Sequence, residues 1–300
     1  MMEKFRIGYF ADSPWGHLTL DKLLQDVSLE IAFIVPRNDT KDSYLKSKAN
    51  DYGIDYLVPV KVNSEEFYQR AEAYHCDLFV SMSYNQIFRE RIYNLPKYKT
   101  INCHAGKLPF YRGRNILNWA LINDEKEFGI TVHYVDDGID TGDIILQRTF
   151  PITDEDDYDT LLKVAYAECP KILYQAIKEI QEGTSLRIPQ DIISLYGAYC
   201  GMRQVGDELI DWGQTSREIF NFVRSICKPG PMAATFCTRA RVLVNKVEYN
   251  AGYPVYKGIP GQIIGMDSGC PIVKTKDSYV KILQYESECK LRVGDRLASK

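Results

Sequence analysis

The spacing of apolar and polar residues changes character near residue 200. Before that point, short apolar runs typical of buried strands alternate with segments whose apolar residues recur at helical spacing. The predicted strands are residues 5–10, 31–35, 56–60, 78–82 and 100–104, and the predicted helices are residues 17–26, 41–51, 64–74 and 86–92. A strand–helix–strand order of this kind is typical of a parallel sheet with helices on its faces.

The same pattern continues to a long helix and then gives way to β-rich sequence. We expect a helix at 116–122, strands at 130–135 and 144–149, and an amphipathic helix at 157–182 that Pro170 kinks. A helix at 216–225 and a Pro/Gly cluster at 228–231 precede five short β runs at 233–237, 242–248, 262–266, 272–276 and 279–284. The sequence therefore predicts an α/β domain with a Rossmann-like, mostly parallel sheet over 1–200 and a smaller β-rich, barrel-like domain over 201–300.

Composition and charge exclude several classes of partner. The 300 residues are 45% hydrophobic and 26% charged, as in ordinary soluble proteins. With 37 Lys+Arg against 40 Asp+Glu, no overall basic field attracts nucleic acid or anionic lipid. No apolar run approaches ~18 residues and no signal-peptide pattern opens the chain, so we expect a cytoplasmic protein without a membrane partner.

Cysteines and glycines rule out two familiar kinds of site. The eight cysteines are scattered, with no Cys-x-x-Cys and no zinc-finger spacing, so we interpret them as reduced packing residues. Gly8 and Gly16 are too far apart for a Gly-x-Gly-x-x-Gly fingerprint, and Gly106-Lys107 lacks the remainder of a P-loop. A ligand of this sheet must use another surface.

Candidate chemistry concentrates between residues 101 and 150. Asn102 and His104 are two residues apart on a predicted strand, so both side chains project from the same face, at the carboxyl edge where α/β proteins place their sites. The acidic loop 136–143, with Gly138 inside it, can return a carboxylate to that edge. An amide, an imidazole and a carboxylate suit transfer of an activated acyl group to a neutral amine. As alternatives, the loop is a solvated turn or a weak Ca²⁺ loop, although it lacks the ligand spacing of an EF-hand.

These residues resemble a known motif. Asn102-x-His104, then Leu108-Pro109 and Gly113, then Asp140 at a distance of 38 residues from Asn102, is similar to the pattern of N10-formyltetrahydrofolate-dependent formyltransferases. That family includes glycinamide ribonucleotide, methionyl-tRNA and nucleotide-sugar enzymes. The resemblance covers about residues 4–190, and residues 207–212 resemble the entry to the C-terminal domain of the tRNA and sugar members.

The resemblance implies a catalytic trio and a folate site. Asn102 would stabilise the oxyanion, His104 would accept the proton of the acceptor amine, and Asp140 would orient His104. The co-substrate would be N10-formyltetrahydrofolate, with no metal in the scheme. Its pterin would lie against the turn and the acidic loop that contain Gln86, Ile87, Phe88, Asp136, Gly138 and Asp140.

Three features bear on the acceptor. Residues 36–46 are short and of mixed charge, whereas methionyl-tRNA members resemble one another in a longer basic loop there. Residues 111–119 resemble the motif of enzymes acting on nucleotide-linked 4-amino sugars, and the short glycinamide ribonucleotide enzymes lack a C-terminal β-rich domain. We therefore expect a 4-amino-4,6-dideoxy sugar on a nucleoside diphosphate, of O-antigen, capsule or nonulosonic glycan biosynthesis, as acceptor, contacted by Tyr84, Arg112, Arg114 and Asn115.

Several alternatives stay open. These residues do not distinguish the dTDP, UDP and GDP carriers. The alternative interpretation of Arg112 and Arg114 is as surface ion-pair residues, and we interpret His17, His75 and His133 as structural histidines. Other functions to weigh are a methionyl-tRNA formyltransferase, a formyltetrahydrofolate hydrolase, or a binding module without catalysis. The resemblance to the sugar members also implies a homodimer.

Overall fold

The computed structural model describes residues 4–238 and 240–298. They form two compact units. Unit 1 draws on the ranges 1–113, 129–150 and 164–199, and unit 2 on the ranges 114–128, 151–163 and 200–300.

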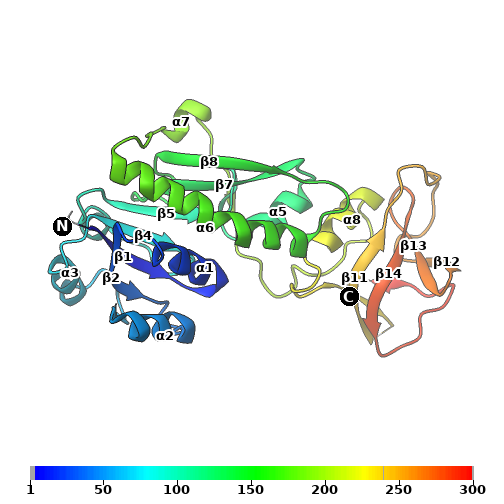
Figure 1. The fold of residues 1–300 in the computed structure, drawn as a ribbon. Helices are drawn as coiled ribbons and strands as arrows, with labels where there is room; N and C mark the ends of the chain where they lie inside the picture. Colours follow the sequence, from blue (N-terminus) through cyan, green and yellow to red (C-terminus); the bar gives the residue numbers. More distant parts are fainter. Residues whose placement is uncertain (1–3, 239, 299–300) are drawn as a thin grey trace. The chain divides into compact units, whose positions relative to one another are not determined.

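Unit 1 is built on a seven-stranded sheet (Figure 1). Its spatial order is β3-β2-β1-β4-β5-β7-β8. The strands are β1 (Phe5–Ala11), β2 (Leu29–Val35), β3 (Asp55–Tyr56), β4 (Leu78–Met82), β5 (Thr100–His104), β7 (Glu127–Tyr134) and β8 (Ile144–Pro151). The pairings from β3 through to β5 are parallel and the β5–β7 pairing is antiparallel, so the Rossmann-like, mostly parallel sheet is confirmed.

Helices follow the strands as the alternating pattern predicts. They are α1 (Ser13–Leu23), α2 (Ser43–Tyr52), α3 (Glu65–Glu72), α4 (Glu90–Tyr93), α5 (Ile116–Ile122), α6 (Tyr158–Glu182) and α7 (Gln190–Ile193). The Ser64 side chain caps α3 by accepting the Phe67 N–H. Helix α6 continues without a break through Pro170. The short strands β6 (Arg112–Gly113) and β9 (Tyr199–Cys200) pair with each other.

Residues of β1 show how the sheet is covered on both faces. The Tyr9 hydroxyl donates to the Gly16 carbonyl of α1 at 2.8 Å, while the next residue, Phe10, packs edge-to-face on Phe33 and Phe79 in an aromatic core. Gly8 faces the rings of Phe33 and Phe79, and a β carbon at Gly8 would stand 2.5 Å from the Phe33 ring. Both faces of the central strand are therefore buried, as a sheet flanked by helices requires.

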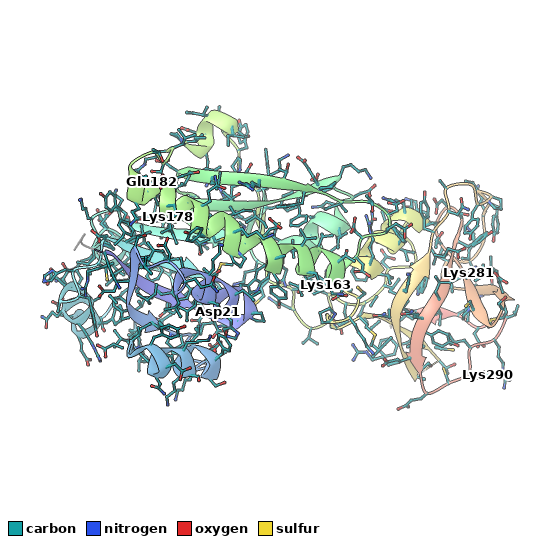
Figure 2. All side chains as sticks on the ribbon, in the orientation of Figure 1. Asp21, Lys163, Lys178, Glu182, Lys281 and Lys290 are labelled. Atoms are coloured by element: carbon teal, nitrogen blue, oxygen red, sulfur yellow. The ribbon has the colours of Figure 1, made fainter. Side chains whose placement is uncertain are left out.

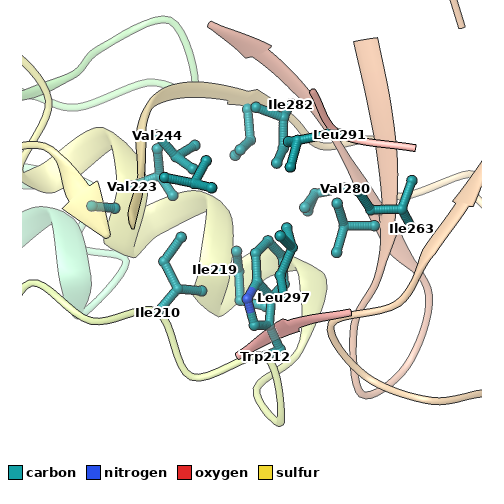
Figure 3. Close-up of a cluster of buried hydrophobic side chains, with 14 of the residues drawn as sticks. Ile210, Trp212, Ile219, Val223, Val244, Ile263, Val280, Ile282, Leu291 and Leu297 are labelled. Carbon is teal, nitrogen blue, oxygen red and sulfur yellow. The ribbon is translucent and has the colours of Figure 1, made fainter. Parts of the chain in front are cut away.

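Unit 2 contains a curled antiparallel sheet with the order β12-β13-β14-β11-β10-β15. Besides α5, which lies in its range 114–128, its elements are α8 (Ser216–Ser225), β10 (Ala233–Cys237), β11 (Ala240–Glu248), β12 (Ile263–Asp267), β13 (Cys270–Lys274), β14 (Tyr279–Ser287) and β15 (Leu297–Ala298). Ile219 and Val223 of α8 pack with Trp212, Val244 and Ile282 in one buried cluster (Figure 3). An isolated β-bridge pairs Gln262, next to the edge strand β12, with Arg296, next to the edge strand β15. The two edges of the curled sheet therefore approach each other.

Three of the predicted elements differ most from the observed bounds. The expected strand at 56–60 is paired only at Asp55–Tyr56, because Pro59 has no N–H to donate and Val60 is exposed. The helix expected from residue 17 begins at Ser13, since Pro14 is favourable in a first turn. The helix expected at 86–92 is reduced to α4, Glu90–Tyr93.

The charged surface and the free thiols are as the composition predicts. Lys163 and Glu182 on α6 and Lys281 on β14 are among the charged side chains that cover the elements (Figure 2). Over residues 4–238 and 240–298, no helix is both long and apolar enough to cross a bilayer. All eight cysteines are free thiols, and five of them are buried.

Shortening a core side chain of unit 2 tests this packing. Ile282→Ala should lower the free energy of unfolding by about 2–5 kcal/mol, because the fully buried side chain leaves a cavity in the cluster. Ile264→Ala, on the partly exposed face of β12, is the matched control and should cost about 1 kcal/mol or less. Urea unfolding of both variants measures the difference, and equal losses would contradict the assigned core.

Candidate active site

The pairing of β5 with β7 builds the base of the candidate site. Asn102 lies opposite His133 and His104 lies opposite Thr131 in the antiparallel register. Directly opposite residues share a face of the sheet, so all four side chains point to the same side. Cys103 points the other way, with its Sγ 4.0 Å from the carbonyl oxygen of Cys169 on α6. The predicted alternation of Asn102 and His104 against Cys103 is thereby confirmed.

The carboxylate of Asp140 lies between the two imidazoles. Its Oδ2 is 3.6 Å from Nδ1 of His104, and its Oδ1 is 3.5 Å from Nε2 of His133. Asn102 completes the group, with Nδ2 at 3.3 Å from the same Nε2 of His133. The structure thus brings together the three residues expected from the motif and adds His133.

The backbone around Asp140 fixes where its carboxylate lies. Asp140 has a left-handed φ of +55°, and its Oδ2 accepts the N–H of Gly113 at 2.8 Å. Two residues on, Gly142 is so close to β7 that a β carbon would stand 1.9 Å from the Tyr134 carbonyl oxygen. Only glycine fits there, so the predicted return of a carboxylate to the sheet edge depends on this close approach.

Hydrogen bonding assigns the protons on the two imidazoles. His104 Nε2 lies 2.7 Å from the Tyr111 carbonyl oxygen, which only accepts, so Nε2 carries a proton and donates it. Nδ1 of His104 is then the ring atom that can take up a proton, and it faces Asp140. By the same reasoning His133 carries a proton on Nδ1 and donates it to the Tyr134 carbonyl at 2.7 Å. Its Nε2 lies 3.5 Å from Asp140 Oδ1 and 3.3 Å from Asn102 Nδ2.

The electrostatic environment keeps Asp140 ionised. Burial by itself would raise the pKa of Asp140, but the facing imidazoles of His104 and His133 and the Gly113 N–H outweigh it and hold the pKa of that carboxyl well below its usual range. A fixed negative charge therefore stands next to the proton-accepting nitrogen of His104.

The residues expected to line a folate site lie in two loops of unit 1. In the turn after β4, Gln86 accepts the Val62 N–H at 2.9 Å, Phe88 is buried, and Ile87 is 66% exposed. In the second loop, Asp136 accepts the N–H of Gly138 at 3.1 Å. The Thr141 hydroxyl also donates to Asp136, so this acidic loop is locally braced.

The residues expected on the acceptor side differ in how they are engaged. Tyr84 is half-buried and stacks on Phe88 with ring centroids 5.5 Å apart. The Arg112 guanidinium donates to Gln190. In unit 2, Arg114 is exposed with Nη1 3.3 Å from Met202 Sδ, and Asn115 Oδ1 accepts the Arg203 N–H at 3.0 Å.

Sequence reasoning missed two residues of this group. His133 was interpreted as a structural histidine because its place opposite Asn102 depends on the antiparallel pairing of β5 and β7. Gln190, 50 residues after Asp140, was not singled out at all, yet its amide contacts the Asp140 backbone. An antiparallel pairing of the predicted strand that contains His133 with the strand that contains Asn102 would have placed His133 in the site. No local signal in the sequence marks Gln190.

Acid unfolding tests the charge state of Asp140. Because its folded-state pKa is depressed, ionised Asp140 stabilises the fold fully above the unfolded value of about 4, and this contribution is lost as the pH falls below it. Asp140→Asn keeps an oxygen for Gly113 but not the charge. The stability difference between wild type and variant, from urea unfolding, should be largest near neutral pH and shrink below about pH 4. A difference that is constant from neutral to acid pH would refute the assignment.

Comparison with known proteins shows what these features belong to. Residues 9–177 match the Formyl transferase family model, and residues 204–295 match the model Formyl transferase, C-terminal domain. A methionyl-tRNA formyltransferase of Pelotomaculum thermopropionicum is 33% identical over 84% of this chain and 80% of its own length, and one of Geotalea uraniireducens is 30% identical over 99% and 96%. Among solved structures, the N-formyltransferase from Helicobacter canadensis in complex with folinic acid and dTDP-3-aminofucose has a TM-score of 0.72 at 20% identity, covering 95% of this chain and 100% of that one. The chain belongs to the formyl transferase family.

Proposed function

We propose that this formyltransferase moves the formyl group of N10-formyltetrahydrofolate to the 4-amino group of a nucleotide-linked 4-amino-4,6-dideoxy sugar. Family membership supports the enzyme class and the donor. The observation that supports transfer to an amine is the placement of Asp140 beside the proton-accepting nitrogen of His104, 3.6 Å away. The identity of the acceptor rests on separate evidence.

The reaction needs one proton moved and one oxyanion stabilised. The acceptor nitrogen bonds to the formyl carbon, the bond from that carbon to N10 breaks, and the proton lost by the amine ends on N10. His104 Nδ1 is the relay, because its proton-bearing form is stabilised by the carboxylate of Asp140. Asn102 Nδ2 lies 3.3 Å from His133 Nε2, and an amide hydrogen of Asn102 would be donated to the oxyanion of the tetrahedral intermediate.

The turn after β4 fits a pterin. The Asn85 Oδ1 in this turn is buried and has no hydrogen-bond partner among the described residues, although buried acceptors normally have one. A pterin ring presents N–H donors that would satisfy it. The exposed Ile87 beside it offers an apolar contact for the ring. We propose that Gln86, Ile87 and Phe88, together with the loop of Asp136, Gly138 and Asp140, hold the donor.

The connection between β2 and α2 supports a small acceptor over tRNA. It spans residues 36–42 and has two basic side chains, of which Arg37 is paired with Asp39 at 2.7 Å. The Thr40 hydroxyl donates to the buried Asp12, which anchors the connection to the end of β1. A short, tethered segment of mixed charge lacks the array of cations that attracts a nucleic-acid backbone. The Helicobacter canadensis neighbour, whose structure contains dTDP-3-aminofucose, supports the same choice.

Methionyl-tRNA is the second candidate acceptor. The observation in its favour is sequence identity, since the Pelotomaculum and Geotalea methionyl-tRNA formyltransferases match this chain at 33% and 30%. Identity in the catalytic unit reflects the shared formyl-transfer chemistry, whereas acceptor choice depends on peripheral segments such as residues 36–42.

Further assignments accompany the proposal. We propose a catalytic domain over residues 1–200 and a C-terminal domain over 201–300, a cytoplasmic location, and a homodimer. Tyr84, Arg112, Arg114 and Asn115 are the proposed acceptor-side residues, with the exposed guanidinium of Arg114 suited to a diphosphate.

A substrate panel tests the acceptor. Purified protein is mixed with N10-formyltetrahydrofolate and, separately, dTDP-, UDP- and GDP-linked 4-amino sugars, methionyl-tRNA, or buffer alone. We expect tetrahydrofolate release together with a formyl mass gain on one of the sugars. Formylation of methionyl-tRNA alone would replace the proposed acceptor, and folate release in buffer alone at the same rate would make the protein a hydrolase.

Replacing the proposed proton acceptor tests the chemistry. His104→Asn removes the ring nitrogen that takes up a proton, so kcat should fall by roughly 10³-fold with the fold retained. His75→Asn, at an exposed histidine outside the site, is the control and should keep wild-type kcat. Thermal unfolding checks that both variants are folded, and kcat within tenfold of wild type for His104→Asn would remove His104 from the mechanism.

A further inference from the structure

We propose that Gln190 is a positioning residue that holds Asp140 in its reactive place, an inference that rests on the proposed function. Gln190 Nε2 donates two hydrogen bonds to the backbone of the acidic loop 136–143. The acceptors are the carbonyl oxygens of Asp140, at 2.9 Å, and of Gly142, at 2.8 Å. It does not reach the reacting atoms; its partners are backbone groups on either side of the turn that presents the carboxylate.

The acceptor end of the same amide is also occupied. Gln190 Oε1 receives the Arg112 guanidinium, from Nε at 3.1 Å and from Nη2 at 2.6 Å. Arg112 immediately precedes Gly113, whose N–H donates to the Asp140 carboxylate. The segment around residue 112 and the loop around residue 140 are therefore joined twice, once through the Asp140 side chain and once through Gln190.

The backbone delivers Gln190 to this place. Ile188 and Ile144 exchange two hydrogen bonds, of 2.8 and 2.9 Å, which align the chain before α7 with the start of β8. Gln190, two residues after this bridge, is only 4% exposed. A buried amide with its donors and acceptor satisfied is a rigid link, because breaking any one contact leaves a polar group unpaired away from water.

The chemistry of the link selects glutamine. Glutamate has the same shape but has no N–H to give the two carbonyls, and it would add a negative charge near Asp140. Asparagine has the right groups on a side chain shorter by one methylene. Alanine removes the link and leaves the Asp140 and Gly142 carbonyls without this donor.

The left-handed backbone of Asp140 explains why losing the Gln190 hydrogen bonds would displace the carboxylate. A non-glycine residue at φ +55° is held there by its surroundings, and Gly142 is fixed against β7 by close contact. Without the two Gln190 hydrogen bonds the turn can relax, which would move the carboxylate away from His104. A displacement of about 1 Å at a reacting group can cost on the order of 100-fold in rate.

Kinetics of Gln190 variants test the inference. We expect Gln190→Ala and the isosteric Gln190→Glu each to lower kcat by about 30- to 100-fold, with the KM for N10-formyltetrahydrofolate changing less than about fivefold. Gln190→Asn should lie between them and wild type. Gln175→Ala is the matched control, since that glutamine on α6 also accepts from an arginine and donates to an oxygen, Glu179 Oε1, but has no link to the loop. It should retain wild-type kcat.

A double-mutant cycle separates positioning from general support of the fold. If Gln190 acts through Asp140, adding Gln190→Ala to Asp140→Ala should lower single-turnover rates by less than about threefold, because the group being positioned is gone. A further 30-fold loss in the double variant would mean that Gln190 acts elsewhere and would overturn the inference. If Gln190→Ala does not fold, the cycle is run with Gln190→Glu, which preserves the buried volume.

The two proposals fail in different ways. If the wild-type protein formylated none of the nucleotide-linked sugars, the proposed function would be overturned. Full activity in Asp140→Ala would instead remove Asp140 from the reaction and, with it, the positioning role of Gln190. A large loss in Asp140→Ala together with wild-type kcat in both Gln190→Ala and Gln190→Glu would leave the proposed function standing and refute the positioning role alone.

Discussion

The buried carboxylate of Asp140 is the group on which the arrangement of the site depends. Taking a charge out of water costs several kcal/mol unless opposite charge and hydrogen bonds offset it. Here the offset comes from His104 on β5, His133 on β7 and the Gly113 N–H, which are three separate segments of unit 1. The position of the charge in the folded protein therefore depends on all three segments.

The reversed strand β7 is what makes this possible. Running antiparallel, β7 places His133 opposite Asn102 and ends opposite Ile101. The 136–143 loop that follows turns back, so that the Asp140 carboxylate faces His104 and His133. Because residue 142 is glycine, the loop can pack closely against the Tyr134 carbonyl, and the Asp140 carboxylate lies between the two imidazoles.

The same catalytic arrangement is compatible with more than one acceptor amine. Relatives of comparable length include methionyl-tRNA enzymes by sequence, while the fold is shared with a neighbour crystallised with a nucleotide-linked amino sugar. A catalytic centre of an amide, an imidazole and a carboxylate acts on the amine alone and does not recognise what the amine is attached to. Recognition therefore belongs to the surrounding segments, of which the tethered connection 36–42 is the most informative here.

The sequence by itself determined the order of strands and helices, the parallel α/β class, the β-rich C-terminal unit, and the motif residues Asn102, His104 and Asp140, because apolar periodicity and motif spacing are local properties of the chain. Only the tertiary structure decided that His133 faces Asn102 and that Gln190 reaches the Asp140 backbone. These contacts join residues 31 and 50 positions apart, and they depend on strand register and loop path. Register and path are set by packing of the whole sheet, which no short stretch of sequence encodes.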